Sequence, residues 1–351
     1  MKKLESVIPA LLVGLFFCVG CSDSGQQGES STGPAATRPF EVEVVKSEEM
    51  QEVTRITKQA GELLQGERYA ELEALAHDYR TSRKSFPTGT WHLERFYDGL
   101  EIPRSEPDER WLNHISKLRA WIRKSPQSIT PRVALADAWV SFAWKARGAG
   151  YADTVTDRAW TLYFARLEEA GKLLAAAGRL QEKCPFAAAV LLRVALGQSW
   201  DRKRYDAVFE QAVASHPGYL YHSARAYHLL PRWHGEPGEW EADLSKSADS
   251  IGGKAGDLLY TRVVWQMSIG TPNVFKEASL SWDRIERGFE VMEEEFPESL
   301  YAASMRAYLA IMSGDRDTAR KYTERLEGKV ELTVWRSLEN YHQLMDWLYG
   351  Q

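Results

Sequence analysis

Apolar residues recur every three to four positions through almost the whole chain, and this period constrains the fold more than any other feature. The spacing matches the turn of an α-helix, and no stretch of the sequence alternates with a period of two for long enough to predict a strand. Each helix must bury its apolar stripe against a neighbour. The pattern therefore predicts an all-α protein of about fifteen helices joined by short turns.

Residues 130–147 are apolar on two sides of the expected helix. One side carries Val133, Ala136 and Val140, and the other carries Leu135, Trp139 and Phe142. A helix with two apolar sides needs a neighbour on each of them. Inner helices of stacked hairpin arrays have such neighbours. We therefore expect a helical-hairpin solenoid.

Residues 297–329 enclose one predicted helix pair. Within it, Ala307, the turn Gly314-Asp315 and Ala319 have the spacing of a tetratricopeptide repeat, so the segment resembles one. It departs from the usual Trp, Leu and aromatic residue of such repeats at Ala303, Arg306 and Thr323. The resemblance implies a degenerate, tetratricopeptide-like hairpin.

The first twenty residues have the character of an export signal. Lys2 and Lys3 precede an apolar run at 7–19, which is too short to span a membrane. The run ends in Cys18-Val19-Gly20-Cys21-Ser22, which resembles the lipobox of bacterial lipoproteins, although Cys18 replaces the usual Leu. The resemblance implies cleavage before Cys21 and fatty acyl chains, such as palmitate, on that residue. Secretion without lipidation, after the same cleavage, is the alternative.

The segment that follows Cys21 lacks large apolar residues up to about Arg38. Such a segment cannot compensate for its loss of entropy on ordering, so we expect a flexible tether. By the same lipoprotein resemblance, Ser22 favours the outer membrane in an organism that has one. The expected location is the cell envelope, with the folded part facing the periplasm or the exterior.

The charge balance excludes a nucleic-acid binder, and the cysteine content excludes a fold that depends on disulfides. The chain has 44 Lys and Arg against 49 Asp and Glu, so it lacks the basic excess of a nucleic-acid binder. After removal of Cys18, a lipidated Cys21 leaves only Cys184, so no intramolecular disulfide is expected. Cys184 precedes an apolar helix and is interpreted as a structural thiol.

Sequence signatures of catalysis and metal binding are missing. There is no His-Glu-x-x-His pattern, phosphate-binding Gly-rich loop or Gly-x-Ser-x-Gly elbow. His222, His228 and His234 are six residues apart, which places successive members on different faces of a helix. We therefore predict no catalytic residue, no metal site and no cofactor.

Several turn motifs together resemble a bacterial, tetratricopeptide-like domain family of unknown function over residues 108–270. They are the Pro231-Arg232-Trp233-x-Gly235 turn with Pro-Gly-Glu-Trp-Glu behind it, the segment 128–134, the Arg147-Gly148 turn and the segment 253–260. The resemblance supports the fold prediction and implies no activity, substrate or partner.

Two of these motifs provide the candidate binding residues, which are Arg147, Tyr151, Arg232, Trp233 and Trp240. In one groove, guanidinium groups would bind a carboxylate or phosphate, and the rings would supply stacking area. The alternative is structural: Arg232 would hold backbone carbonyls of its turn, and Trp233 and Trp240 would fill the core.

The predicted organisation has five parts. They are a signal peptide at 1–20, a lipidated Cys with a flexible tether at 21–43, an N-terminal helical hairpin region at 44–105, a tetratricopeptide-like domain of unknown function at 106–275, and C-terminal helical repeats at 276–351. The favoured function is a membrane-tethered scaffold that binds a protein or peptide in a helical-repeat groove. The alternatives are an all-helical, toroid-like enzyme acting on envelope glycan or peptide, with Glu239 or Glu241 as the acid, and a purely structural subunit.

Overall fold

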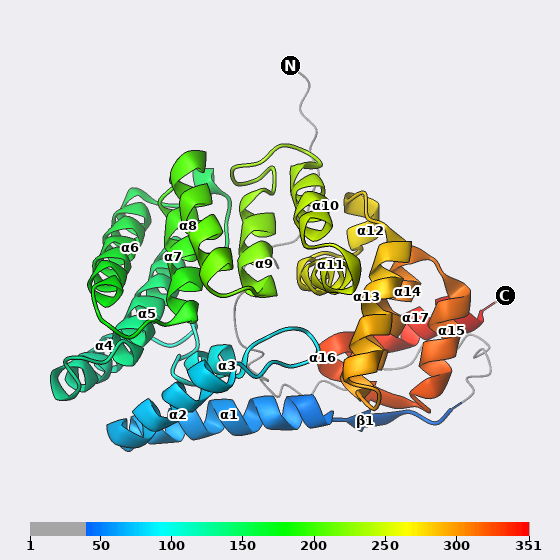
Figure 1. Cartoon of the computed structure of the whole chain (residues 1–351), viewed down its shortest axis with the longest axis horizontal. Helices are drawn as coiled ribbons and strands as arrows, with labels where there is room; N and C mark the ends of the chain where they lie inside the picture. The colour runs from blue at the N-terminus through cyan, green and yellow to red at the C-terminus, as the bar shows by residue number, and fades with distance from the viewer. Residues whose placement is uncertain (1–39, 351) are drawn as a thin grey trace. The chain divides into compact units, whose positions relative to one another are not determined.

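The computed structural model describes residues 40–350 (Figure 1). This part of the chain contains seventeen α-helices, one 3-10 helix and two strands of three residues each. The all-α, helical-hairpin prediction is confirmed. The predicted signal peptide, Cys21 and nearly all of the tether fall on residues 1–39, outside the described range. Among residues 40–350, no helix combines the length and the apolar character needed to cross a membrane.

The chain divides into two compact units, which are described separately. In the described range, unit 1 comprises residues 101–215 and 269–272, and unit 2 comprises residues 40–100, 216–268 and 273–350. Unit 1 contains α4 (Asp108–Lys124), α5 (Thr130–Arg147), η1 (Ala152–Thr154), α6 (Asp157–Gly178), α7 (Pro185–Gly197) and α8 (Arg202–Ser215). Unit 2 contains β1 (Glu43–Val45), α1 (Glu48–Gln65), α2 (Tyr69–Ser82), α3 (His92–Gly99), α9 (Tyr219–His228), α10 (Glu239–Ile251), α11 (Gly253–Ser268), α12 (Val274–Glu277), α13 (Trp282–Glu295), α14 (Leu300–Ser313), α15 (Arg316–Arg325), β2 (Lys329–Glu331), α16 (Leu332–Trp335) and α17 (Leu338–Tyr349).

Helix α5 forms the centre of unit 1. It packs against α4, α6 and α7, and both of its predicted apolar sides contribute buried residues, including Val133, Leu135 and Phe142. The ring of Phe142 stacks on Trp111 of α4 at a centroid distance of 5.3 Å. Cys184 is buried at the start of α7. The prediction of an inner helix with neighbours on both sides is confirmed.

Helices α1, α2 and α3 pack together at the N-terminal end of unit 2. Ser47 begins α1, and its hydroxyl accepts a hydrogen bond from the N–H of Met50. Gly99 allows α3 to approach α1, because a Cβ at this position would lie 2.3 Å from the carbonyl oxygen of Thr57.

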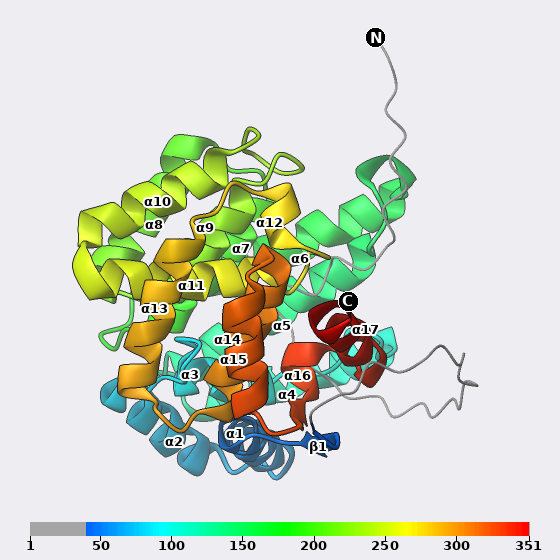
Figure 2. The same cartoon turned by 90° about the vertical axis from the view of Figure 1, so that its right-hand side faces the viewer.

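The C-terminal half of unit 2 consists of successive packed helices. Helix α11 packs against α9, α10 and α13, and α14 packs against α13 and α15. Figure 2 shows α14 and α15 side by side. The α14–α15 turn uses Gly314 with a φ of 88° and Asp315, whose carboxylate accepts a hydrogen bond from the N–H of Thr318 at 3.0 Å. The helix pair predicted over residues 297–329 is therefore present.

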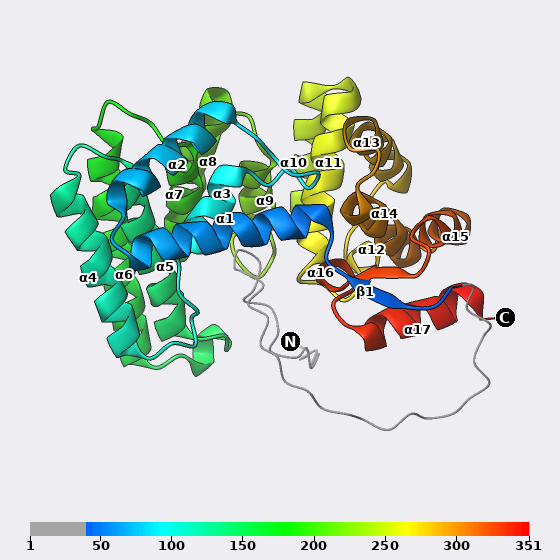
Figure 3. The same ribbon diagram turned by 90° about the horizontal axis from the view of Figure 1, so that it is seen from below.

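Strands β1 and β2 pair in parallel, with Val44 opposite Val330. The short β1 leads directly into α1 (Figure 3). It begins at Glu43, the last residue of the predicted tether. These strands are an exception to the expectation of helix throughout, because three-residue strands are too short to produce an alternating pattern.

Candidate functional site

The connection between α5 and α6 in unit 1 holds two of the predicted binding residues, Arg147 and Tyr151. Helix α5 ends at Gly148, whose φ of 74° is accessible to glycine at little cost. The guanidinium of Arg147 donates hydrogen bonds to the carbonyl oxygens of Gly148 and Gly150 at 3.1 and 3.0 Å. It also lies over the rings of Trp144 and Trp160, at 5.5 and 5.6 Å from their centroids. Arg147 is thus held in one position by the turn and by two indole rings.

Aromatic side chains beside Arg147 reach solvent. Trp160 stacks on Phe164 along α6 at a centroid distance of 5.5 Å, and Phe164 is 48% exposed. Tyr151, in the connection itself, is 70% exposed. We call Arg147, Tyr151, Trp160 and Phe164 the α5–α6 patch. The sequence analysis included the first two and missed Trp160 and Phe164, because helical spacing alone does not distinguish aromatic residues of the core from those that reach solvent.

The Pro-Arg-Trp-x-Gly turn in unit 2 is held mainly by its own backbone. The N–H of Trp233 donates to the carbonyl of Leu230 at 2.8 Å, and the N–H of His234 donates to the carbonyl of His228 at 3.1 Å. Gly235 is required here, because a Cβ would lie 1.9 Å from the carbonyl oxygen of Leu229. The turn in this conformation therefore requires glycine at position 235.

Arg232 and Trp233 both contact Tyr227, the penultimate residue of α9. The guanidinium of Arg232 lies 5.2 Å from the ring centroid of Tyr227, and the ring of Trp233 lies 5.9 Å from it. Arg232 is exposed and Trp233 is partly exposed. The structural alternative for Arg232 invoked backbone carbonyls, whereas the structure positions it on an aromatic ring.

Trp240 and the two candidate acids lie at the start of α10. Trp240 is only 4% exposed, so its ring packs in the interior, as in the structural alternative for this residue. Glu239 accepts a hydrogen bond from the N–H of Glu236 at 2.9 Å and closes the turn before the helix, while Glu241 is buried. The surface-accessible part of the motif is therefore Arg232 and Trp233.

The structure brings together two histidines that the spacing argument separated. The rings of His228 and His234 stack at a centroid distance of 4.5 Å. This contact arises because the chain leaves the helix after His228 and turns back at Pro231. Burial lowers the pKa of the nearby helix residue His222 to about 4. Within residues 40–350, no group of three or more His, Cys, Asp or Glu side chains could hold a metal ion.

The five predicted groove residues are divided between the two units. Arg147 and Tyr151 belong to unit 1, and Arg232, Trp233 and Trp240 belong to unit 2. Inside unit 1, Arg147 is joined to indole rings of α5 and α6, and inside unit 2, Arg232 and Trp233 share Tyr227.

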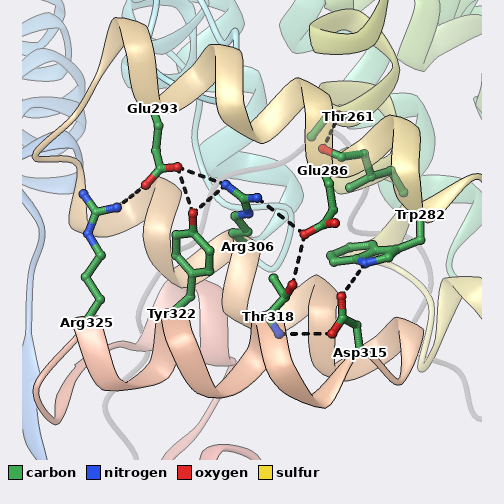
Figure 4. Close-up of polar contacts among 10 residues, drawn as sticks. Thr261, Trp282, Glu286, Glu293, Arg306, Asp315, Thr318, Tyr322 and Arg325 are labelled. Atoms are coloured by element: carbon green, nitrogen blue, oxygen red, sulfur yellow. Dashed lines mark hydrogen bonds and ion pairs between the residues drawn. The ribbon is translucent and has the colours of Figure 1, made fainter.

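A polar network links α13, α14 and α15 in unit 2 (Figure 4). Arg306 is buried in α14 and donates hydrogen bonds to Glu293 Oε2 at 2.9 Å and to the Tyr322 hydroxyl at 2.6 Å. The Tyr322 hydroxyl donates in turn to Glu293 Oε2 at 2.8 Å, and Arg325 contacts the other carboxylate oxygen. One carboxylate therefore binds three side chains from two helices.

A second part of the network surrounds Glu286. This carboxylate accepts hydrogen bonds from the Thr318 hydroxyl at 3.0 Å and from Arg306 at 3.4 Å. Trp282 donates from its indole nitrogen to Asp315 Oδ2 at 2.8 Å (Figure 4). The sequence signal for the network was Arg306 itself, which occupies a position where tetratricopeptide repeats commonly carry Leu.

The network changes the acidity of its members. Burial and the hydrogen bond to Glu293 raise the pKa of Tyr322 to about 12. Burial alone would raise the pKa of Glu293, but hydrogen bonds from Tyr322 and Arg325 and the charge of Arg306 outweigh it and lower that pKa. The network therefore holds an ionised carboxylate and a neutral phenol at neutral pH, which suits a fixed structural link.

Unit 1 contains its own buried ion pair. Asp137 of α5 contacts the guanidinium of Arg193 on α7, and both side chains are buried. Arg166 of α6 donates a hydrogen bond to the carbonyl of Phe142 at 2.7 Å and lies over the ring of that residue. These contacts join α6 and α7 to the central helix.

Comparison with known proteins gives one partial match. Residues 57–198 match the family model described as Domain of unknown function (DUF4034). The match begins inside α1 and ends just after α7, so it overlaps the predicted range 108–270 only in part and excludes the Pro-Arg-Trp-x-Gly turn. No curated protein and no solved structure matches the chain. The prediction of an uncharacterised domain is confirmed: the segment 57–198 is similar to a domain family of unknown function.

Proposed function

We propose that the chain is a lipid-anchored interaction scaffold of the bacterial cell envelope that binds a protein or peptide and catalyses no reaction. The observation that carries the proposal is the exposure of Tyr151 and Phe164 beside the immobilised guanidinium of Arg147. Helical-hairpin proteins commonly bind their partners through side chains presented by the helices and their connections.

The composition of the α5–α6 patch supports a protein partner. Tyr, Trp and Arg are the residue types enriched at the energetically dominant positions of protein interfaces. Covering the rings of Tyr151 and Phe164 would remove apolar area from water. Because Arg147 is already fixed by two carbonyls and two rings, binding would immobilise little additional side-chain freedom.

The sequence around Cys21 supports the proposed membrane anchor. Each buried methylene of an acyl chain contributes about 0.8 kcal/mol, and stable anchoring needs more than one chain. A diacylated and N-acylated Cys21 would meet that need. Residues 22–38 would then connect the anchor to the folded part.

A quantitative pulldown from detergent-solubilised membranes tests the scaffold function. The bait is the full chain with a C-terminal tag, compared with a Tyr151→Ala/Phe164→Ala double variant. We expect recovery of a discrete partner by the wild type and at least a tenfold lower recovery by the double variant. Leu112→Ala is the matched control, since Leu112 is 56% exposed on α4 and lies outside the patch. Equal recovery by wild type and double variant would contradict the proposal.

Arg232→Ala examines the cluster in unit 2 in the same assay. The side chain is exposed and contacts one ring, so its removal is expected to leave the melting temperature nearly unchanged. Loss of partner recovery with unchanged melting would add this turn to the binding surface. A large fall in melting temperature would assign Arg232 a structural role.

A further inference from the structure

Unit 1 carries an excess of positive charge that the balance of the whole chain conceals. In its described range, residues 101–215 and 269–272, there are 18 Lys and Arg against 13 Asp and Glu. The whole chain has 44 against 49, so the acidic excess belongs to the rest of the protein. An uneven division of charge is typical of a protein whose basic part contacts an anionic partner.

Helix α4 concentrates this positive charge in its last two turns. Its two acidic residues, Asp108 and Glu109, lie in the first turn, and the rest of the helix contains no acid. Arg119 and Arg123 are one helical turn apart and therefore lie on the same side of the helix. We call the four cations of the last two turns the α4 basic face, and they are Lys117, Arg119, Arg123 and Lys124.

The exposed part of this face is opposite the packed side of the helix. Helix α4 packs against α5 (Figure 1), and its buried residues include Trp111 and Leu118. Arg119, Arg123 and Lys124 are exposed. The apolar side thus fixes the helix in unit 1, while the three cations reach solvent.

The exposed cations of the face have no internal counter-charge. Within residues 40–350, no Asp or Glu forms an ion pair with Arg119, Arg123 or Lys124. Lys145 of the same unit, in contrast, lies 2.8 Å from a carboxylate oxygen of Asp108. The charge of the α4 basic face is therefore available to an anion from outside the chain.

An aromatic ring lies beside the face. The guanidinium carbon of Arg119 is 5.9 Å from the ring centroid of Trp139 on α5, and that ring is partly exposed. Guanidinium groups combine contacts to aromatic rings with hydrogen bonds to phosphate oxygens. Trp is enriched at membrane surfaces, because its ring is apolar and its indole N–H is polar.

We infer that the α4 basic face binds the anionic headgroups of a phospholipid bilayer. Cations near a membrane are attracted by its negative surface, and clusters of about four to eight Lys and Arg on a helix are typical of such contacts. The cations follow two turns of one helix, an arrangement that suits a flat surface with many phosphates.

This inference deepens the proposed function and rests on it for a membrane nearby. A flexible tether of residues 22–38 would keep the folded part close to the bilayer that holds the acyl chains. The contact would turn α4 of unit 1 toward the headgroups and add a second attachment. Unlike the acyl anchor, this attachment weakens as salt screens the charges.

Vesicle flotation tests the inference in the absence of the acyl anchor. The protein is the chain from residue 22 onward, which keeps every described residue and lacks Cys21. Vesicles of phosphatidylcholine alone are compared with vesicles that also contain about 30% phosphatidylglycerol, at about 0.05 M and 0.5 M salt. We expect binding to the anionic vesicles to be at least about tenfold tighter at low salt, and this preference to disappear at high salt.

A triple variant, Arg119→Gln/Arg123→Gln/Lys124→Gln, removes the exposed charges of the face. Each cation close to an anionic surface contributes about fivefold to binding, so we expect the variant to bind the anionic vesicles at least about tenfold more weakly. Arg119→Lys/Arg123→Lys keeps the charges and should bind within about twofold of wild type. Circular dichroism of each variant verifies that the fold is retained.

A matched control separates the position of the charges from their number. Lys172→Gln/Arg179→Gln/Lys203→Gln removes three exposed cations of unit 1 that lie on α6, just after it and on α8. The net charge falls by the same amount as in the first triple variant. The control should bind the anionic vesicles within about threefold of wild type, because its substitutions lie outside the α4 basic face.

The assay is independent of the scaffold function. The protein carries no acyl chain, and the Tyr151→Ala/Phe164→Ala variant should bind vesicles like the wild type. A failure of the anchor or of the α5–α6 patch is therefore distinguishable from a failure of the α4 basic face.

Three results would overturn the inference. One is equal binding to neutral and anionic vesicles, and another is an equal loss of binding in the two triple variants. The third is capture of an acidic protein through the α4 basic face by a chain that binds neither kind of vesicle, which would assign the face to a protein partner.

Discussion

Arg306 of α14 donates a hydrogen bond to the hydroxyl of Tyr322 on α15 at 2.6 Å, and its guanidinium lies 4.4 Å from the centroid of that ring. The pair joins the two helices of a hairpin that the sequence analysis expected to resemble a tetratricopeptide repeat. Where such repeats commonly carry Leu, this chain uses a charged residue that also binds Glu293 and Glu286. Arg306 thus belongs to a polar network that links α13, α14 and α15.

Arg306→Leu is expected to destabilise the protein, although it places an apolar side chain at a buried position. The substitution leaves Glu286 without its cation and removes one of two cations from Glu293, at a cost of about 2–4 kcal/mol. Urea unfolding measures the change. Arg325→Ala, at a side chain that is 42% exposed, should cost about 1 kcal/mol or less. A more stable Leu variant would show that the network is dispensable.

Arg193→Met removes one partner of the buried ion pair in unit 1. The remaining carboxylate of Asp137 would be buried without a counter-charge, which typically costs about 3–5 kcal/mol. Replacing both partners, as Asp137→Leu/Arg193→Met, should recover most of this loss, because no charge then remains buried. A double-mutant cycle by chemical denaturation checks the prediction, and simple additivity of the two single changes would disagree with it.

Stability should fall as the pH decreases from 7 to 5. His222 has a folded pKa of about 4, below its unfolded value, so the unfolded state binds more protons in this window. The expected loss from this residue is about 2 kcal/mol between pH 7 and pH 5. His222→Gln should remove that part of the slope in pH-dependent urea unfolding, whereas His77→Gln, at an exposed position, should keep it. An unchanged slope in the His222 variant would refute this assignment.

Gly235→Ala tests the conformation of the Pro-Arg-Trp-x-Gly turn. A methyl group there would overlap the carbonyl of Leu229, so the turn must open, and we expect a loss of about 2 kcal/mol or more. Gly66→Ala is the control in the same unit, because its added Cβ would make only ordinary contacts. Differential scanning calorimetry distinguishes the two variants, and a Gly235 variant that melts like wild type would mean that the turn is not constrained.

The helices could be predicted because each buries its own periodic stripe. The two apolar sides of α5, with Val133 on one and Leu135 on the other, correctly indicated a helix with neighbours on both sides. The ends of two helices could also be predicted from glycine, since Gly148 and Gly314 follow the last residues of α5 and α14 and have positive φ. Local periodicity and turn chemistry were therefore sufficient for the fold class.

The arrangement of the candidate site could not be predicted in the same way, because it depends on contacts between residues that are distant in the sequence or separated by a turn. The pairing of Val44 with Val330 joins distant parts of the chain, and the stacking of His228 on His234 requires the chain to turn back. The burial of Trp240 and the exposure of Phe164 follow from which helix faces meet a neighbour. Aromatic residues at helical spacing look alike in sequence, whether they fill a core or reach solvent.

Site-specific photo-crosslinking tests the scaffold function most directly. A photoreactive benzoyl-phenylalanine is placed at position 151 or 164 in the full chain expressed in cells, and the control is placed at exposed position 112. The account predicts a discrete crosslinked partner in the membrane fraction from positions 151 and 164 and none from position 112. Absence of any adduct at both patch positions, or the same adducts from all three, would contradict it.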